Sequence, residues 1–266
     1  MTPLGITILA SGSAGNATLV HTRSEAVLID AGLSAREFFR RLKAVQFDPA
    51  LIRAIVVTHE HTDHIRGLRK CAADLGVPVY ATRLCADWLR AHEPDLGTLV
   101  RFEAGSCFDI GELTLTSFPI RHDAVDPVGY TVSAGEFKIG VATDLGTPSL
   151  TTDYNLRNCN TLVLESNHDL GMLAASSRPW SLKQRILGPI GHLSNPTACE
   201  LLGRLLTPQT HHLILAHISR ECNTYDLALH TAEAELQSLG RTDIRVCALH
   251  QEEPSELFTL EEAGDE

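Results

Sequence analysis

Short apolar runs that end in small or polar residues recur along the chain and predict β-strands. In the first part of the chain these runs cover residues 4–10, 17–21, 26–30, 54–58 and 77–81. Further along they cover residues 99–102, 108–110, 113–118, 128–132, 138–142, 161–165, 211–216, 244–249 and 257–260. Because the runs are shorter than ordinary helices and often β-branched, we expect buried strands.

Helices are predicted between the strands, and helix-capping residues support several of them. We expect helices over residues 35–45, 64–75, 83–91, 148–157, 181–188, 195–206 and 224–239. Ser34 has the residue type of an N-cap, Gly76 and Gly240 end two helices, and Asn195-Pro196 looks like an N-cap followed by proline at the first helical position. Gly135-Glu136 predicts a hairpin turn.

The strands come in two blocks, each mixed with helices, with no linker and no internal repeat between them. This arrangement predicts an α/β fold in which two sheets pack face to face with helices outside, as one domain over residues 1–266. The chain has 266 residues, of which 44% are hydrophobic, enough for a sizeable core.

Composition restricts where the protein works and what it binds. No apolar stretch reaches about 18 residues and the N-terminus has no signal-peptide pattern, so we expect a cytoplasmic protein without membrane contact. The seven cysteines form no C-x-x-C motif, which predicts reduced, mostly buried thiols. A net charge of −11 argues against broad attraction to nucleic acid, although bound divalent cations would add local positive charge.

The densest chemistry lies in residues 58–66, directly after an apolar run. They read Thr-His-Glu-His-Thr-Asp-His-Ile-Arg, an H-x-H-x-D-H pattern. Side chains two apart in an extended segment point the same way, so His59 and His61 can converge on one metal ion. Asp63 and His64 are adjacent and diverge, so as the chain turns into a helix they can face a second ion.

Three more potential ligands each follow a predicted strand: His122, Asp144 and His217. Taken singly, each has an ordinary explanation as a loop, turn or core residue. The recurrence of the same arrangement, a strand followed by a ligand, favours a site where several strand ends meet.

The order H-x-H-x-D-H, His122, Asp144, His217 resembles the metallo-β-lactamase superfamily. The resemblance spans essentially the whole chain and implies a four-layer αββα sandwich. It also implies that the first metal is held by His59, His61 and His122, that the second is held by Asp63, His64 and His217, and that Asp144 bridges the two.

Further motifs resemble the YycJ (WalJ) group within that superfamily. They are Ser11-Gly12-Ser13-Ala14-Gly15-Asn16, Thr143-Asp144-Leu145-Gly146, Glu165-Ser166-Asn167-His168-Asp169, Gly191-His192-Leu193-Ser194-Asn195 and Ala216-His217-Ile218-Ser219. The group is related to RNase Z and to PhnP-type phosphodiesterases, and the resemblance implies 5′-to-3′ exonuclease activity on double-stranded DNA. Two residues depart from the group's pattern: Arg178 replaces an aromatic residue, and Glu221 stands where paired asparagines are more usual.

Two divalent ions can share a bridging hydroxide, which would attack phosphorus in line. Asp63 is a candidate to orient this nucleophile, and His192 to protonate the leaving alkoxide. Glu165 is a candidate partner for a ligand or for His192. Ser194 and Asn195, where amides of a helix N-terminus can bind phosphate, and Asn167 and His168, which follow a strand, are candidate substrate-binding residues.

Zn²⁺ suits this ligand set best, and Mn²⁺ or Fe²⁺ are also accepted by it. The expected partner is DNA as substrate, with no membrane, and the sequence leaves the oligomeric state open, a homodimer included. One alternative function is a small-molecule hydrolase acting on a cyclic phosphodiester, thioester or lactone with the same metals. Another is a non-catalytic metal-binding module.

Overall fold

The computed structural model describes residues 3–260, whose strands form two mixed sheets. The first sheet has the order β14 (Phe258–Leu260), β1 (Leu4–Ala10), β2 (Ala17–His21), β3 (Ala26–Ile29), β4 (Ile52–Val56), β5 (Val79–Thr82), β6 (Leu99–Phe102). The second has the order β13 (Arg245–Ala248), β12 (His212–Ala216), β11 (Thr161–Glu165), β10 (Phe137–Ala142), β9 (Val128–Ala134), β8 (Leu113–Pro119), β7 (Cys107–Ile110).

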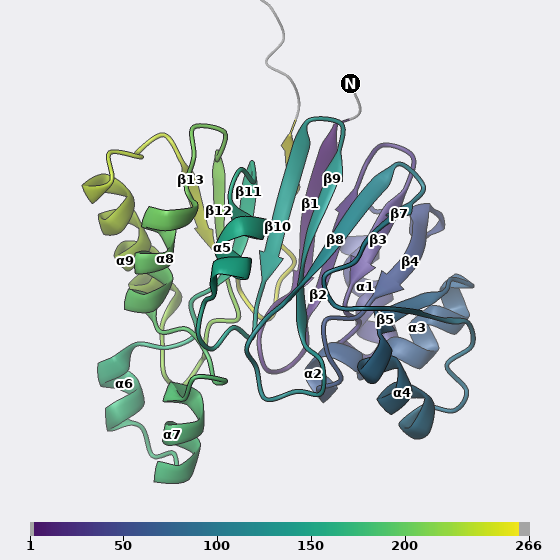
Figure 1. The fold of residues 1–266 in the computed structure, drawn as a ribbon, viewed down its shortest axis with the longest axis horizontal. Helices are drawn as coiled ribbons and strands as arrows, with labels where there is room; N and C mark the ends of the chain where they lie inside the picture. Colours follow the sequence, from purple (N-terminus) through teal and green to yellow (C-terminus); the bar gives the residue numbers. More distant parts are fainter. Residues whose placement is uncertain (1–2, 261–266) are drawn as a thin grey trace, which may run out of the picture.

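Helices cover the outer faces of both sheets, so the four-layer prediction is confirmed (Figure 1). The first sheet is covered by α1 (Ala35–Ala44), α3 (Leu68–Leu75) and α4 (Arg83–His92). The second is covered by α5 (Leu150–Leu156), α8 (Asn195–Leu205) and α9 (Tyr225–Ser238). Three short helices, α2 (Thr62–Ile65), α6 (Leu170–Ala175) and α7 (Trp180–Leu187), lie at the lower edge in this view, and a 3₁₀ turn spans Pro49–Leu51.

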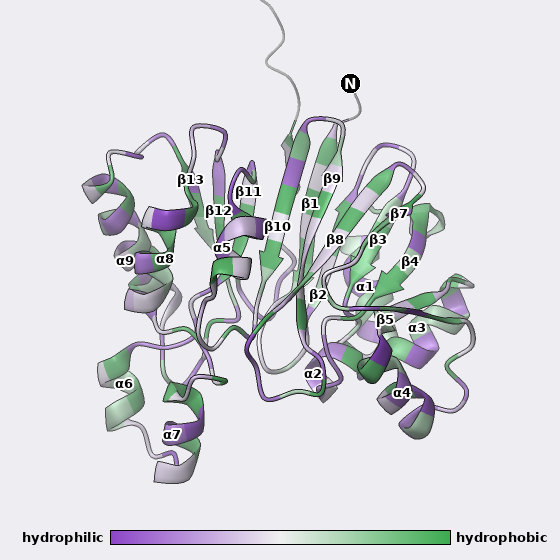
Figure 2. Ribbon diagram, viewed as in Figure 1, coloured by the Kyte–Doolittle hydropathy of each residue, from purple (hydrophilic) through white to green (hydrophobic). Residues whose placement is uncertain are grey.

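The hydrophobic core has three parts because side chains on a strand alternate between its two faces. In β4, Ala54 and Val56 face the layer between the sheets, whereas Ile55 packs against the outer helices. In β12, Ile214 faces the middle layer and Leu215 the helices. Figure 2 shows the result, with largely hydrophobic strands and helices of mixed polarity.

Parallel pairing brings the ends of several strands to one edge. Strands β3 to β6 are mutually parallel, and so are β10 to β13. The residues just past β3, β10 and β12 include Asp30, Asp144 and His217, all in the left-handed region with φ of 62°, 56° and 53°. Left-handed backbone is costly for these residue types and is a frequent feature of functional sites.

Several element predictions need correction. The helix expected over residues 64–75 is broken at Gly67, whose N–H donates to the Ala31 carbonyl and where a Cβ would lie 2.0 Å from the Leu33 carbonyl oxygen. The N-cap of α8 is Ser194 instead of Asn195, because the Ser194 hydroxyl accepts from the Thr197 amide. The six-residue helix α6 was not predicted.

The strand expected over residues 257–260 is present but joins the first sheet. Strand β14 pairs antiparallel with β1, with Leu260 opposite Leu4. Within residues 3–260, no helix combines the length and apolar character needed to cross a membrane.

Candidate metal centre

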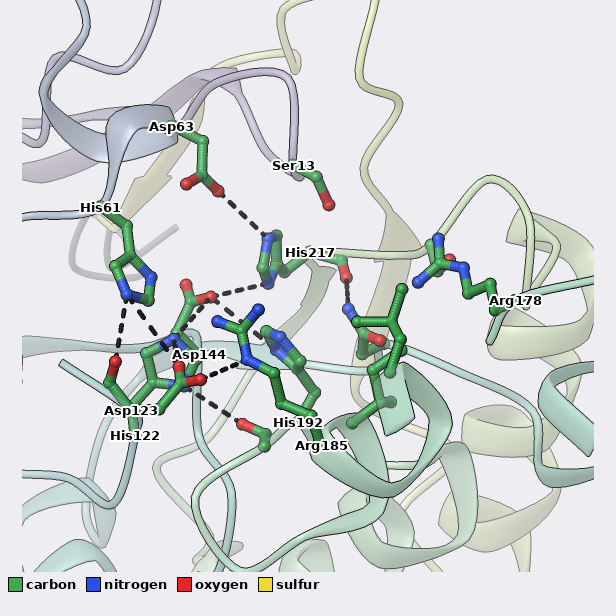
Figure 3. A pocket seen from close by; sticks show the side chains of 15 residues that line it. Ser13, His61, Asp63, His122, Asp123, Asp144, Arg178, Arg185, His192 and His217 are labelled. Atoms are coloured by element: carbon green, nitrogen blue, oxygen red, sulfur yellow. Dashed lines mark hydrogen bonds and ion pairs between the residues drawn. The ribbon is translucent and has the colours of Figure 1, made fainter. Parts of the chain in front are cut away.

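The structure brings the seven predicted metal ligands together where the two sheets meet. Ligand atoms of His59, His61 and His122 lie within 4.8 Å of one another, and the same holds for His59, His64 and Asp144. A third group of this kind joins Asp144 and His217 to Glu165 and His192. Asp63 reaches the cluster through its Oδ2 atom, 3.6 Å from Nε2 of His64 and 3.8 Å from Nε2 of His217. Figure 3 shows the members of this cluster that line the pocket.

The cluster fits divalent cations. The Nε2 atoms of His59 and His217 are buried, and no hydrogen-bond partner reaches either atom from within residues 3–260. A buried polar atom without a partner is costly, and imidazole nitrogens beside carboxylates are the donors that zinc, manganese and iron accept. The metal-binding character of the site therefore follows from its donor atoms, whereas the number and identity of the ions do not.

Buried partners orient the histidines on the side of the first sheet. Asp30 lies 2.7 Å from Nδ1 of His64 and accepts hydrogen bonds from the amide and the hydroxyl of Thr58, each at 2.8 Å. The Thr58 hydroxyl is also 3.0 Å from Nδ1 of His59. Because both Nδ1 atoms are engaged, the Nε2 atoms are the ones that face the centre, where that of His64 also lies 3.0 Å from the Asn16 side-chain nitrogen. No role for Asp30 was predicted, because an aspartate after a strand also occurs in ordinary turns.

Glu165 has the corresponding position on the side of the second sheet. Its side chain is fully buried, and Oε1 lies 2.9 Å from Nδ1 of His217 and 2.8 Å from Nδ1 of His192. Its other oxygen accepts from the backbone amides of Leu145 and Leu193. The prediction that Glu165 contacts a ligand or His192 is confirmed, and one carboxylate contacts both.

Charges in the centre shift several pKa values. Burial alone lowers the pKa of His217, but Asp144, Asp63 and Glu165 outweigh it and raise this pKa to about 10. The pKa of Glu165 falls to about 2, because His192 and His217 outweigh its burial. Burial likewise lowers the pKa of His192, but Glu165 and Asp144 raise it above the usual value. Without a cation, protonated imidazoles therefore compensate the buried carboxylates.

The centre opens into a pocket of about 200 Å³, and only part of the predicted substrate-binding set reaches it. Asn167 lines the pocket. His168 is buried behind it, and the Ser194 hydroxyl caps α8. The Asn195 side chain hydrogen-bonds to Ser166 and Asn223. These last three residues do not line the pocket, and their contact with substrate stays a prediction.

Three further charged residues line the pocket: Asp123, Arg178 and Arg185, of which the sequence offered only Arg185, with Lys183, as a candidate contact to a nucleic-acid backbone or else as part of a solvated helix face. Arg185 of α7 is paired with Asp123, whose Oδ1 lies 3.3 Å from Nε2 of His122. Across the pocket, Nε of Arg178 lies 3.1 Å from a carboxylate oxygen of Glu221. The two departures from the YycJ (WalJ) pattern thus pair with each other. A single sequence does not show which residues lie close together in space, so this ion pair could not be predicted from it.

Comparisons with known proteins agree with this geometry. A model of the beta-lactamase superfamily domain matches residues 25–218. The exodeoxyribonuclease YycJ of Bacillus anthracis is 34% identical over 94% of this chain and 96% of its own length. The exodeoxyribonuclease WalJ of Streptococcus pneumoniae is 34% identical over 90% of this chain and 89% of its own length. Among solved structures, the metallo-β-lactamase fold protein YhfI of Bacillus subtilis matches with a TM-score of 0.74 at 15% identity, covering 97% of this chain and all of that one.

Proposed function

This chain belongs to the β-lactamase superfamily, in the YycJ and WalJ group of metal-dependent hydrolases, and on that premise we propose that it is an exonuclease degrading double-stranded DNA from the 5′ end. The main support for this proposal is the position of His192. It lines the pocket beside the metal ligands, and its Nδ1 atom is in hydrogen-bond contact with Glu165. A phosphodiesterase needs such a group, because its leaving alkoxide requires a proton. The relatives named exodeoxyribonuclease, matched over most of their length, support DNA as substrate.

We assign two cations to the centre, with Zn²⁺ as the first choice and Mn²⁺ or Fe²⁺ as alternatives. One would be held by His59, His61 and His122, and the other by Asp63, His64 and His217. Asp144 would be shared, which is supported by its membership of two ligand clusters. Bound there, the cations would lower the pKa of water and neutralise charge on the phosphoryl oxygens.

We assign to Asp63 the role of orienting the attacking water. Its carboxylate lines the pocket, and the Asn16 amide nitrogen lies 3.3 Å from its Oδ2 atom. This contact fixes one oxygen while the side chain stays partly exposed, so the carboxylate can accept a hydrogen bond from water.

We assign to His192 the role of donating a proton to the leaving oxygen. Its Nδ1 atom is engaged by Glu165, which leaves Nε2 as the nitrogen available to substrate. The side chain is 21% exposed, which is enough to contact a bound strand. The raised pKa favours the protonated form needed to neutralise a leaving oxygen.

The test is to incubate the protein with Mn²⁺ or Zn²⁺ and 5′-phosphorylated duplex DNA, single-stranded DNA or RNA. His59→Ala should lose bound metal and activity together. His192→Ala should keep its metal, measured by elemental analysis, and lose turnover by about 10²–10⁴-fold. His230→Ala, at an exposed position of α9, is the matched control and should behave like the native protein.

Three outcomes would contradict the proposal. In the first, the native protein degrades no polynucleotide. In the second, His59→Ala degrades DNA as fast as the native protein does. In the third, the protein hydrolyses a small thioester or lactone efficiently and His192→Ala does so equally well, which would favour the small-molecule alternative.

A further inference from the structure

The pocket extends beyond the metal centre to Arg178, and Ser219 and Asn167 also belong to its lining. In Figure 3, Arg178 lies on the opposite side of the pocket from His61 and Asp123, with its guanidinium directed inward. We propose that this end is a phosphate-binding subsite for the DNA strand, with Arg178 as its principal ligand. The inference rests on the proposed function and adds a second contact point on the same strand.

The charges lining the pocket separate into two ends. Among the described residues, the carboxylates that line it are Asp63, Asp123 and Asp144. Asp63 and Asp144 belong to the metal centre, and Asp123 is paired with Arg185. Among the described residues that line the pocket, none of the carboxylates is paired with Arg178, and the opposing charge nearest to its guanidinium is Glu221, which does not line the pocket.

The guanidinium of Arg178 keeps most of its donors free for a ligand. Guanidinium has five N–H donors, and within residues 3–260 only Nε has a hydrogen-bond or ion-pair partner, the Glu221 carboxylate. The Arg178 side chain is 26% exposed and that of Glu221 is 48% exposed. Ion pairs this exposed contribute little, so Glu221 can orient the arginine without competing strongly against a phosphate, which arginine binds in bidentate geometry.

Neutral donors of the pocket wall, one of them two residues before Glu221 in the chain, are fixed relative to the metal centre. The Ser219 hydroxyl oxygen accepts from the Cys222 amide, which leaves its proton free to donate. The Ser219 amide donates to the carbonyl of Asn167, whose side chain in turn donates to the carbonyl of His217. The subsite is thereby tied to a residue of the metal centre, so it holds a phosphate at a set distance from the scissile bond.

Arg178 itself is held by its own segment. The Lys183 ammonium donates to the carbonyls of Ala174 and Ser176, each at 2.7 Å, and this closes the connection between α6 and α7 around Arg178. Lys183 is therefore committed within the segment, and Arg185 is committed to Asp123. Of the cations between residues 170 and 187, all of which the structure describes, Arg178 is the one whose partner is an exposed carboxylate and that remains available to substrate.

Either of two phosphates of the strand has the required chemistry: the terminal 5′-phosphate or an internal phosphate next to the scissile one. The test measures binding to the metal-loaded protein by fluorescence anisotropy, for duplexes of one sequence with cleavage-resistant phosphorothioate linkages and either a 5′-phosphate or a 5′-hydroxyl. Arg178→Ala, Arg178→Lys and Glu221→Gln are compared, with Arg83→Ala as control. Arg83 is an exposed arginine on α4, paired with Glu103.

We expect Arg178→Ala to weaken binding by about 10–100-fold, the range of a charge-assisted hydrogen bond, and Arg178→Lys to retain part of it. The slope of log affinity against log salt should fall by about 0.9, one phosphate contact. Loss confined to the 5′-phosphorylated duplex identifies the terminal phosphate, and equal loss on both duplexes identifies an internal one. Glu221→Gln keeps the guanidinium and should bind at least as well as the native protein.

Two results would overturn the inference. One is native affinity and native salt slope in Arg178→Ala on both duplexes. The other is a loss in Glu221→Gln as large as in Arg178→Ala, which would mean that the ion pair acts only by holding the segment in place. Kinetics with Mn²⁺ separate this inference from the proposed function: a native protein that cleaves no DNA defeats the function, whereas the binding comparison still decides the subsite.

Discussion

At the residue scale, the centre depends on side chains that never touch substrate. Asp30 and Glu165 each fix the Nδ1 atom of a histidine, His64 and His217, from opposite sheets. Both carboxylates are buried, and both are also anchored by backbone amides. Partners of this kind set the tautomer and orientation of the ligands and so control metal affinity.

Asp30→Asn should therefore weaken metal binding while leaving the fold intact. The amide keeps the shape of the carboxylate but presents a donor as well as an acceptor, so it holds the His64 ring less firmly. We expect a loss of about 10–100-fold in metal affinity, measured by titration with a competing chelator. Asp48→Asn, at the exposed N-cap of the 3₁₀ turn, is the control and should bind metal normally. If Asp30→Asn binds metal as tightly as the native protein, the contacts of Thr58 alone are enough to orient the histidines.

The metal ligands were predictable for a reason specific to these residues. His122, Asp144 and His217 each follow an apolar strand, and this recurrence favoured a shared site, whereas their assignment as ligands came from the family resemblance. The substrate-binding roles of His168 and Ser194 stay predictions, because both residues are buried and neither lines the pocket, and the direction of a loop side chain depends on backbone contacts. The His168–Ser194 bridge that turns these two inward joins residues far apart in the sequence.

At the scale of elements, α6 and α7 form an extension that carries Arg178 and Arg185 to the pocket (Figure 1). A separate small apolar cluster of Leu173, Ile186 and Cys222, with Leu182 against it, supports this extension. The sequence predicted α7 but not α6, because six residues carry too little helical periodicity. The structure nonetheless holds α6 in place, since Asp169 caps it and donates its amide to the Cys222 carbonyl.

Leu173→Ala should loosen the extension selectively. Removing a buried leucine from this small cluster leaves a cavity, and the resulting loss should be local because the three main core clusters do not include this side chain. We expect faster amide hydrogen exchange over residues 170–187 and a higher KM for DNA, with metal content and kcat nearly unchanged.

Leu42→Ala, in the core under α1, is the matched comparison for the Leu173 variant. It should lower global stability by about 2–5 kcal/mol without selectively raising exchange over residues 170–187. If Leu173→Ala instead lowers global stability as much and leaves KM unchanged, the extension is an integral part of the core.

At the scale of the whole molecule, the metal centre joins the two sheets. His59, His61, Asp63 and His64 follow β4 of the first sheet, whereas His122, Asp144 and His217 belong to the second. Ions bound between them should therefore stabilise the packing of the sheets as well as catalyse the reaction. Binding to the folded state alone adds stability according to the ratio of free ligand to Kd.

Removal of metal should lower the melting temperature. At a free ion concentration 100 times Kd, metal binding adds about 2.7 kcal/mol to the free energy of unfolding. For a chain of this size that corresponds to a change in melting temperature of about 5–10 °C. Scanning calorimetry before and after EDTA, and again after Zn²⁺ or Mn²⁺ is restored, checks this. His59→Ala should show a smaller shift, and an identical melting temperature with and without metal in the native protein would contradict the expectation.

Thiol reactivity should report on the integrity of the fold. Burial raises the pKa of both Cys71 and Cys159 to about 12, so these thiols stay protonated and unreactive in the native state. Cys107, at the start of the edge strand β7, is exposed. Alkylation with iodoacetamide at pH 8, followed by peptide mass spectrometry, should modify Cys107 first and the other two only in denaturant. Equal labelling of the three in native buffer would contradict the burial.

The pairing of β14 with β1 has a consequence for how the protein is made. The other strands of the first sheet are translated early, but the outer edge of β1 has no strand partner until residues 258–260 have left the ribosome. A nascent chain, or a copy truncated by a premature stop codon before that point, exposes an unpaired and strongly apolar strand edge. Such edges template pairing between molecules, so incomplete copies should be held by chaperones or aggregate.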